Sequence, residues 1–188
     1  MDAIEALSTR VSCPKLEEPA PTSAQIDQLM SAAVRAADHG CLKPWRFMLI
    51  QGEGLPQLGQ VFLKAALEDE PELSEAQQQK TLNMPLRAPA ILVAIASCQE
   101  HPKVPLIEQQ IAAGAATQNI ITAAYALGLG AMWRTGAMAY SEVVCEALGL
   151  SDHEMIIGFV YLGTPQNGFR TLQPQAPNEF ISDWPSQG

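Results

Sequence analysis

The feature that most constrains the fold of this 188-residue chain is a long apolar stretch between residues 104 and 127. Its length and spacing predict the longest helix of the protein, apolar on most of its sides. A helix of this kind belongs in the middle of a protein or in an interface between subunits. Charged and amide side chains interrupt the stretch, so we expect a buried helix and not a membrane span: Glu108, Gln109, Gln110, Gln118 and Asn119.

The composition limits the class of protein further. The hydrophobic fraction of 47% suits a globular domain, and we expect one domain over residues 1–188. A net charge of −9 argues against nucleic-acid binding and against adhesion to anionic membranes. The four cysteines lack the spacing of a zinc site, so we expect free thiols and no metal. The N-terminus has acidic residues where a signal peptide would carry basic ones, which favours a cytoplasmic protein.

Periodicity and capping signals predict helices over residues 2–9, 22–40, 55–67, 74–83, 104–127 and 141–148. Thr22 and Gln25 have the spacing of a capping box, and Gly40 is expected to end the same helix. Residues 68–72 are acidic and predict an exposed, mobile loop. Residues 164–188 are rich in Pro, Gln, Asn and Gly and predict an extended tail.

Apolar runs predict strands over residues 47–50, 90–96, 131–134 and 155–162. The run over residues 90–96 is continuously apolar, as expected for a central strand buried on both faces. Strands that alternate with helices suggest a parallel α/β sheet by default. The connections themselves do not fix the strand directions.

The first candidate site follows the first predicted helix. Arg10, Ser12 and Lys15 offer two cations and a hydroxyl group within one short loop. Guanidinium groups bind phosphate in a bidentate manner, and a serine adds a neutral hydrogen bond. The alternative is that these are unrelated surface residues.

The second candidate site is the segment over residues 35–47. The predicted helix places Arg35 and His39 one turn apart on the same face, so both could approach one ligand. Pro44 then turns the chain into an apolar strand. The alternative is that the helix dipole alone favours cations at this helix end.

The third candidate site is the segment over residues 128–136. Gly128 and Gly130 follow a helix, whereas the glycines of a dinucleotide-binding fingerprint follow a strand, so we exclude a Rossmann site. A glycine-containing strand can bring its backbone close to a flat ligand. A helix end followed by a core strand also explains both glycines. It leaves Arg134 within a strand unexplained.

Together these three segments, in this order and at these separations, resemble the FMN-dependent nitroreductase family, and in particular its short, YdjA-like branch. The resemblance extends to the predicted helix over 104–127 and to the terminal run up to Pro165. It implies an α+β fold with a mainly antiparallel sheet flanked by helices, against the parallel default. It also implies a homodimer with two FMN sites at the subunit interface.

On the pattern of that family, Arg10, Val11 and Ser12 bind the phosphate and ribityl groups of the flavin. Arg35 and His39 reach the same flavin from the other subunit. A further set lines it from the first subunit, namely Trp133, Arg134 and Thr135. The family commonly has a second arginine where this chain has Val11, which predicts weaker phosphate binding here.

The chemistry that the resemblance implies is a ping-pong transfer of electrons from NAD(P)H, through FMN, to a nitroaromatic or quinone acceptor. The sequence contains no convincing nucleophile or metal cluster, so an organic cofactor would carry the reaction and no protein residue is expected to be catalytic. Two alternatives stay open. One is a non-catalytic flavin-binding or sensor protein on the same fold, and the other is a flavin-free interaction module.

Overall fold

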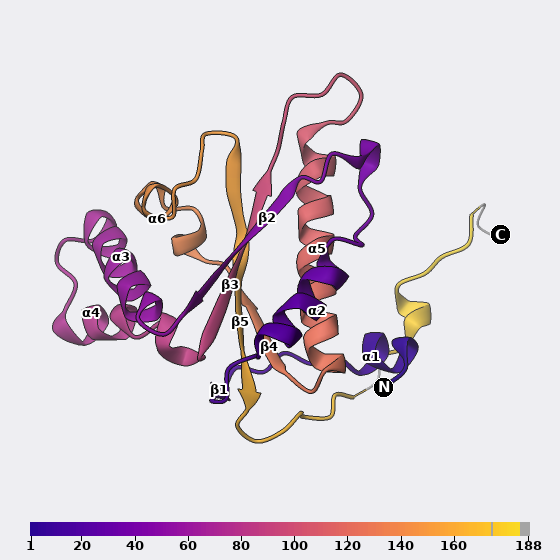
Figure 1. The fold of residues 1–188 in the computed structure, drawn as a ribbon, viewed down its shortest axis with the longest axis horizontal. Helices are drawn as coiled ribbons and strands as arrows, with labels where there is room; N and C mark the ends of the chain where they lie inside the picture. Colours follow the sequence, from indigo (N-terminus) through magenta and orange to yellow (C-terminus); the bar gives the residue numbers. More distant parts are fainter. Residues whose placement is uncertain (174, 185–188) are drawn as a thin grey trace.

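The structure is a computed structural model that describes residues 1–173 and 175–184. Its centre is an antiparallel sheet with helices on both faces (Figure 1). The strands are β1 (Leu16–Glu17), β2 (Trp45–Gln51), β3 (Ala90–Ser97), β4 (Gly130–Arg134) and β5 (Glu154–Pro165). The fold class is therefore α+β, as the resemblance implied, and the default of a parallel sheet is wrong.

The long strand β5 organises the sheet because it has partners on both edges. Along one edge it pairs with β3, from Ala90 opposite Leu162 to the far end of the strand. Along the other edge it pairs with β4, and at its end Thr164 and Pro165 pair with β1. β2 covers the outer edge of β3. β3 is therefore central, which confirms the prediction made from its continuous apolar run.

Six α-helices flank the sheet in the part of the chain that the structure describes. They are α1 (Ala3–Thr9), α2 (Ser23–Ala33), α3 (Gly54–Asp69), α4 (Glu75–Leu82), α5 (Leu106–Ala126) and α6 (Glu142–Ala147). In Figure 1, α2 and α5 lie on one side of the sheet, and α3, α4 and α6 lie on the other. No helix among the described residues combines the length and apolar character needed to cross a membrane.

Capping boxes form at two helix starts, of which the sequence predicts the one at Thr22. Thr22 and Gln25 form a capping box at α2, and Ser74 and Gln77 form one at α4. The acidic stretch differs slightly from expectation, because α3 continues to Asp69 before the exposed turn begins.

The predicted tail also differs from expectation in two places. Strand β5 continues to Pro165, and a short 3₁₀ helix forms at Pro177–Glu179. Residues 174 and 185–188 of the predicted tail lie outside the described residues.

Helix α2 is shorter than predicted, and this changes the second candidate site. It ends at Ala33, so Arg35 and His39 do not share a helix face and that prediction is wrong. The side-chain amide of Asn119, on α5, donates a hydrogen bond of 3.1 Å to the carbonyl of Ala32. A long-range contact thus satisfies a helix-end carbonyl. Ala36 still packs against the core from the following turn, which extends the apolar spacing beyond the helix.

Helix α5 is long and apolar, as predicted, and it packs one face on the sheet. Its buried residues include Ala116, Ile120 and Ala124, which join the same core cluster as Leu92 and Val160 of the sheet. The amide of Gln109 is also buried and donates to the carbonyls of Gln99 and Val104. Other apolar side chains of α5 and of α1 stay exposed, namely Ile107, Ile111, Ile4 and Leu7.

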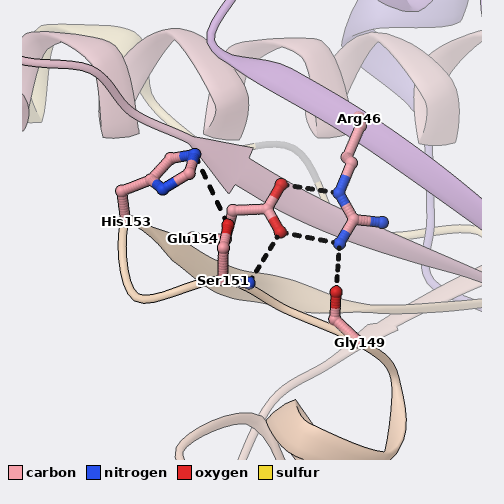
Figure 2. A network of polar contacts seen from close by, with 5 residues as sticks. All are labelled: Arg46, Gly149, Ser151, His153 and Glu154. Carbon is pink, nitrogen blue, oxygen red and sulfur yellow. Dashed lines mark hydrogen bonds and ion pairs between the residues drawn. The ribbon is translucent and has the colours of Figure 1, made fainter.

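An ion pair crosses the sheet at the start of β5 (Figure 2). Arg46 of β2 donates two hydrogen bonds to the carboxylate of Glu154, at 2.6 and 2.7 Å. The backbone N–H of Ser151 donates to the same carboxylate at 3.1 Å. The Arg46 guanidinium holds the pKa of Glu154 at about 2. The side chain of Glu154 is only 7% exposed. The pair therefore ties the loop before β5 to the far strand of the sheet.

Replacing Glu154 by glutamine should lower the free energy of unfolding at neutral pH by about 1.5–3 kcal/mol, the value of a charged hydrogen bond. The folded pKa of Glu154 lies below its ordinary value of 4.5, so this stabilisation is present above pH 4.5 and is lost as the pH falls toward 2. Chemical denaturation across that pH range should show that the free energy of unfolding decreases less in Glu154→Gln than in the wild type. Glu72→Gln, in an exposed loop, is the control, and equal stability of Glu154→Gln and the wild type would contradict the account.

Candidate functional site

The first and third candidate segments meet at the β4 edge of the sheet. The backbone N–H of Cys13 donates a hydrogen bond of 2.9 Å to the carbonyl of Ala131. Gly130 permits this approach, because a Cβ there would overlap the side chain of Leu16. Residues 13 and 16 of the first segment therefore lie beside residues 130 and 131 of the third. The structure thus brings together two of the three segments that the sequence singled out.

Within the first segment, the side chains at positions 10, 11 and 12 have different environments. Arg10 ends α1, and both Arg10 and Ser12 are half-buried. Val11 is only 3% exposed and belongs to the buried hydrophobic set. Its side chain is therefore part of the core, and position 11 could offer a ligand only its backbone. Lys15 is exposed.

A further arginine, which the sequence did not indicate, lies close to this segment. Burial raises the pKa of the Cys13 thiol, whereas the charges of Arg170 and Arg10 act to lower it. Both guanidinium groups are thus within electrostatic range of Cys13. Arg170 lies in the tail after β5, where Phe169 packs edge-on against Tyr125 of α5 with ring centroids 4.6 Å apart. Only this tertiary contact brings Arg170 to the site, so no local motif could have revealed it.

The third segment presents side chains to both faces of the sheet. The indole N–H of Trp133 donates to the carbonyl of Ile157 at 3.2 Å, on the side of α2 and α5. The guanidinium carbon of Arg134 lies 5.5 Å from the ring centroid of Tyr161, on the opposite side. Its Nε is buried and has no hydrogen-bond partner among the described residues. Thr135 follows the strand and is exposed.

The second segment lies apart from the other two. His39 contacts the carboxylate of Glu108 in the first turn of α5, whereas β4 follows the last turn of that helix. Ala126 lies 18 positions after Glu108, which corresponds to about 27 Å along the helix axis. Within one chain, the structure therefore does not bring His39 to Arg10. In Figure 1 the loop that holds His39 is at the opposite end of α5 from α1.

A tight turn fixes the conformation of the second segment. Gly40, Cys41 and Lys43 have φ angles of 75°, 55° and 50°, which is unusual for residues other than glycine. The carboxylate of Asp38 accepts a hydrogen bond of 2.7 Å from the backbone N–H of Lys43. Gly40 thus serves this turn and not the helix end predicted for it. Arg35 and His39 both remain exposed on either side of Asp38.

The charges at the β4 edge are unbalanced in a way that suits an anion. Arg46 is the one arginine that forms an ion pair with a carboxylate among the residues described. Arg10, Arg134 and Arg170 are all associated with the N-terminal segment or β4, without such a partner. Arg10 and Arg134 are half-buried and Arg170 is exposed, and guanidinium groups gathered without a counter-charge favour binding of an anionic group. His101 and His153, to which the sequence assigned no role, are exposed.

A substitution at Gly158 tests how closely Trp133 is held on β5. A Cβ at position 158 would overlap the indole Nε1 of Trp133 and crowd the carbonyl of Arg134. Gly158→Ala should therefore lower the free energy of unfolding by about 1–3 kcal/mol and alter the tryptophan fluorescence. Gly114→Ala is the control, because a Cβ there meets nothing within 4 Å. Wild-type stability and fluorescence in Gly158→Ala would contradict the packing described.

Comparison with known proteins agrees with this architecture. Residues 7–164 match the family described as "Nitroreductase family". The chain is 42% identical over 186 residues to "Putative NAD(P)H nitroreductase YdjA" of Escherichia coli (strain K12), covering 97% of this chain and 99% of that protein. Among solved structures, a nitroreductase-like family protein from Bacillus cereus superposes with a TM-score of 0.81 at 22% identity, covering 99% and 97% of the two chains.

A second solved structure has the same fold over its full length. It is a variant of the FMN and NADPH-dependent nitroreductase NfnB derived from Sphigopyxis sp. strain HMH, with a TM-score of 0.77 at 19% identity and full coverage of both chains. The match of the family over most of the sequence and the identity to a full-length relative lead to one conclusion. The chain belongs to the nitroreductase family.

Proposed function

We propose that this protein is an FMN-dependent oxidoreductase that transfers electrons from NAD(P)H to nitroaromatic or quinone acceptors. The observation that carries the proposal is the junction of the N-terminal segment with β4, made by the hydrogen bond from Cys13 to Ala131. This junction places cations that form no ion pair with a described residue beside β4, and the residue that follows β4, Thr135, is exposed. A relative named for NAD(P)H and a structural neighbour named for FMN and NADPH support the same cofactors.

Arg10, Ser12 and Arg170 would bind the phosphate of the cofactor. Arg10 and Ser12 are half-buried at the end of α1, and the charge of Arg170 reaches the same place from the tail. Guanidinium and hydroxyl groups are the donors that a phosphate requires. Val11 would contribute only its backbone, because its side chain is in the core. Arg170 thus offers the second cation that position 11 lacks.

Trp133, Arg134 and Thr135 would line the ring of the flavin at the other end of β4. The buried Nε–H of Arg134 lacks a hydrogen-bond acceptor, which fits a site that an oxygen-bearing ring completes. A cation here also favours the negative charge that a flavin acquires on reduction.

Arg35 and His39 would act on the flavin of a partner subunit. Both side chains are exposed, and His39 lies at the opposite end of α5 from Arg10. Ile107, on the same helix, is 58% exposed, and similar apolar side chains on α1 and α5 are exposed with it. Such a surface suits a symmetric homodimer, in which one helix packs against its copy.

When bound, FMN would accept a hydride from NAD(P)H and pass two electrons to the acceptor in a ping-pong cycle. The residues of the chain would hold and orient the cofactor, exclude water from one side of it and supply positive charge. None of them needs to act as a nucleophile or base. In this proposal residues 1–188 form one flavin-binding domain, with the tail after residue 164 contributing Arg170.

Arg35→Ala should weaken FMN binding by about 1.5–3 kcal/mol, the value of a hydrogen bond to a charged group. A fluorescence titration of the flavin-depleted protein measures this change. Lys64→Ala is the control, since Lys64 is an exposed cation of α3, on the other face of the sheet. Unchanged affinity in Arg35→Ala would contradict its role.

Substitutions of Arg10 and Arg35 together test whether Arg35 acts across the subunit interface. Arg10→Ala and Arg35→Ala should each bind FMN weakly. If each site combines Arg10 of one chain with Arg35 of another, a mixed dimer has one intact site, and an equal mixture recovers about a quarter of the wild-type sites. No recovery after subunit exchange would show that both residues act on the flavin of their own chain or on none.

A further inference from the structure

A pocket of about 420 Å³ lies on the α3 side of the sheet, beside the end of β4. Most of its walls are aromatic or thioether side chains. Phe62 and Phe159 pack edge-on with ring centroids 5.3 Å apart, and three methionines complete the apolar lining, namely Met84, Met132 and Met138. A pocket of this size and lining suits a single small aromatic molecule.

Two guanidinium groups enter this pocket without a counter-charge. Arg87 comes from the short 3₁₀ helix Pro85–Arg87 that precedes β3, and Arg134 comes from the end of β4. Both are half-buried, and neither forms an ion pair or side-chain hydrogen bond within the described chain. No carboxylate of the described residues lines the pocket. Two like charges in an apolar site are costly unless an anion joins them.

Both arginines lie close to Tyr161, which lines the same pocket. Its ring lies under Arg134, and the charges of both Arg87 and Arg134 act on its hydroxyl group. Burial nevertheless raises the pKa of Tyr161, so the hydroxyl remains a neutral hydrogen-bond donor at physiological pH. The pocket therefore presents two planar cations and a phenol around a common space.

We propose that this pocket, which we call the Arg87 pocket, binds the carboxylate end of a small aromatic acceptor, and that Arg87 sets a preference for acceptors with such a group. A guanidinium fork matches the two oxygens of a carboxylate, and the aromatic and methionine walls pack against the ring. The inference rests on the proposed function for the identity of the ligand as an electron acceptor. The binding itself needs only the residues of the pocket.

The position of Arg87 separates the Arg87 pocket from the residues expected to hold the cofactor. Arg87 belongs to none of the three segments that the sequence singled out. The cations assigned to the phosphate lie near Cys13, which pairs with Ala131 three residues before Arg134 on β4. The Arg87 pocket lies at the other end of that strand and is shared only through Trp133, Arg134 and Thr135. An acceptor held there would be adjacent to the proposed ring site.

The test compares two probes of similar shape, 4-nitrobenzoate and nitrobenzene, by equilibrium dialysis against the purified full-length protein of measured FMN content. Arg87→Met should weaken binding of 4-nitrobenzoate about tenfold or more and leave nitrobenzene within about twofold. Arg87→Lys, which keeps the charge but not the fork, should lie between Arg87→Met and the wild type. Lys80→Met is the matched control, an exposed cation of α4 that does not line the pocket, and should change neither probe.

Three results would overturn the proposal. One is a wild-type protein that binds 4-nitrobenzoate no better than nitrobenzene, and another is an equal loss of both probes in Arg87→Met. The third is a loss of FMN affinity in Arg87→Met with 4-nitrobenzoate binding unchanged, which would assign Arg87 to the cofactor. Arg87-dependent binding of 4-nitrobenzoate in a protein that binds no FMN would keep the Arg87 pocket and reject the proposed function.

Discussion

The site depends on the fact that β5 pairs with both β4 and β1 in its C-terminal half. β4 pairs with residues Phe159 to Gly163 of β5, and β1 pairs with the next two residues, Thr164 and Pro165. The loop before β1 lies against β4, where the backbone N–H of Cys13 donates a hydrogen bond to the carbonyl of Ala131. Gly130 makes the approach possible because any side chain there would collide with Leu16. An N-terminal loop and a strand more than 110 residues later thus become one surface.

Electrostatics follow from this arrangement. The chain has a net charge of −9 but keeps most of its arginines without carboxylate partners among the residues described. The exception is Arg46, which forms an ion pair with Glu154 and stabilises the sheet at the end away from β1. The others supply positive charge at the β4 edge, on the Arg87 pocket and near α2. An acidic protein can bind an anionic cofactor when its few cations are placed in this way.

Much of the fold could be predicted from local signals. The capping boxes at Thr22 and Ser74 and the apolar run of β3 act through neighbouring residues, so the sequence carries them directly. The end of α2 could not be predicted, because it involves Asn119 on another helix. The two-residue strand β1 was likewise invisible, since only its pairing with Thr164 and Pro165 defines it.

The site likewise combines residues that short motifs reveal with residues that only the tertiary packing brings together. The three segments were recognisable because each carries its polar residues in a short motif. Arg87 and Arg170 were missed, since each is an isolated cation whose neighbours are set by the packing of η2 (Pro85–Arg87) and the tail. Val11 shows the converse. Its side chain lies in the core and offers a phosphate no charge, whereas Arg170 lies within electrostatic range of the same loop.

The most direct test of the central claim is an anaerobic absorbance titration of the FMN-loaded protein with NADH and with NADPH. The account predicts that at least one nucleotide bleaches the flavin absorbance and that a quinone then restores it. This cycle separates an enzyme from a flavin-binding sensor on the same fold. A flavin spectrum that neither nucleotide changes, or a protein that takes up no FMN, would contradict the account.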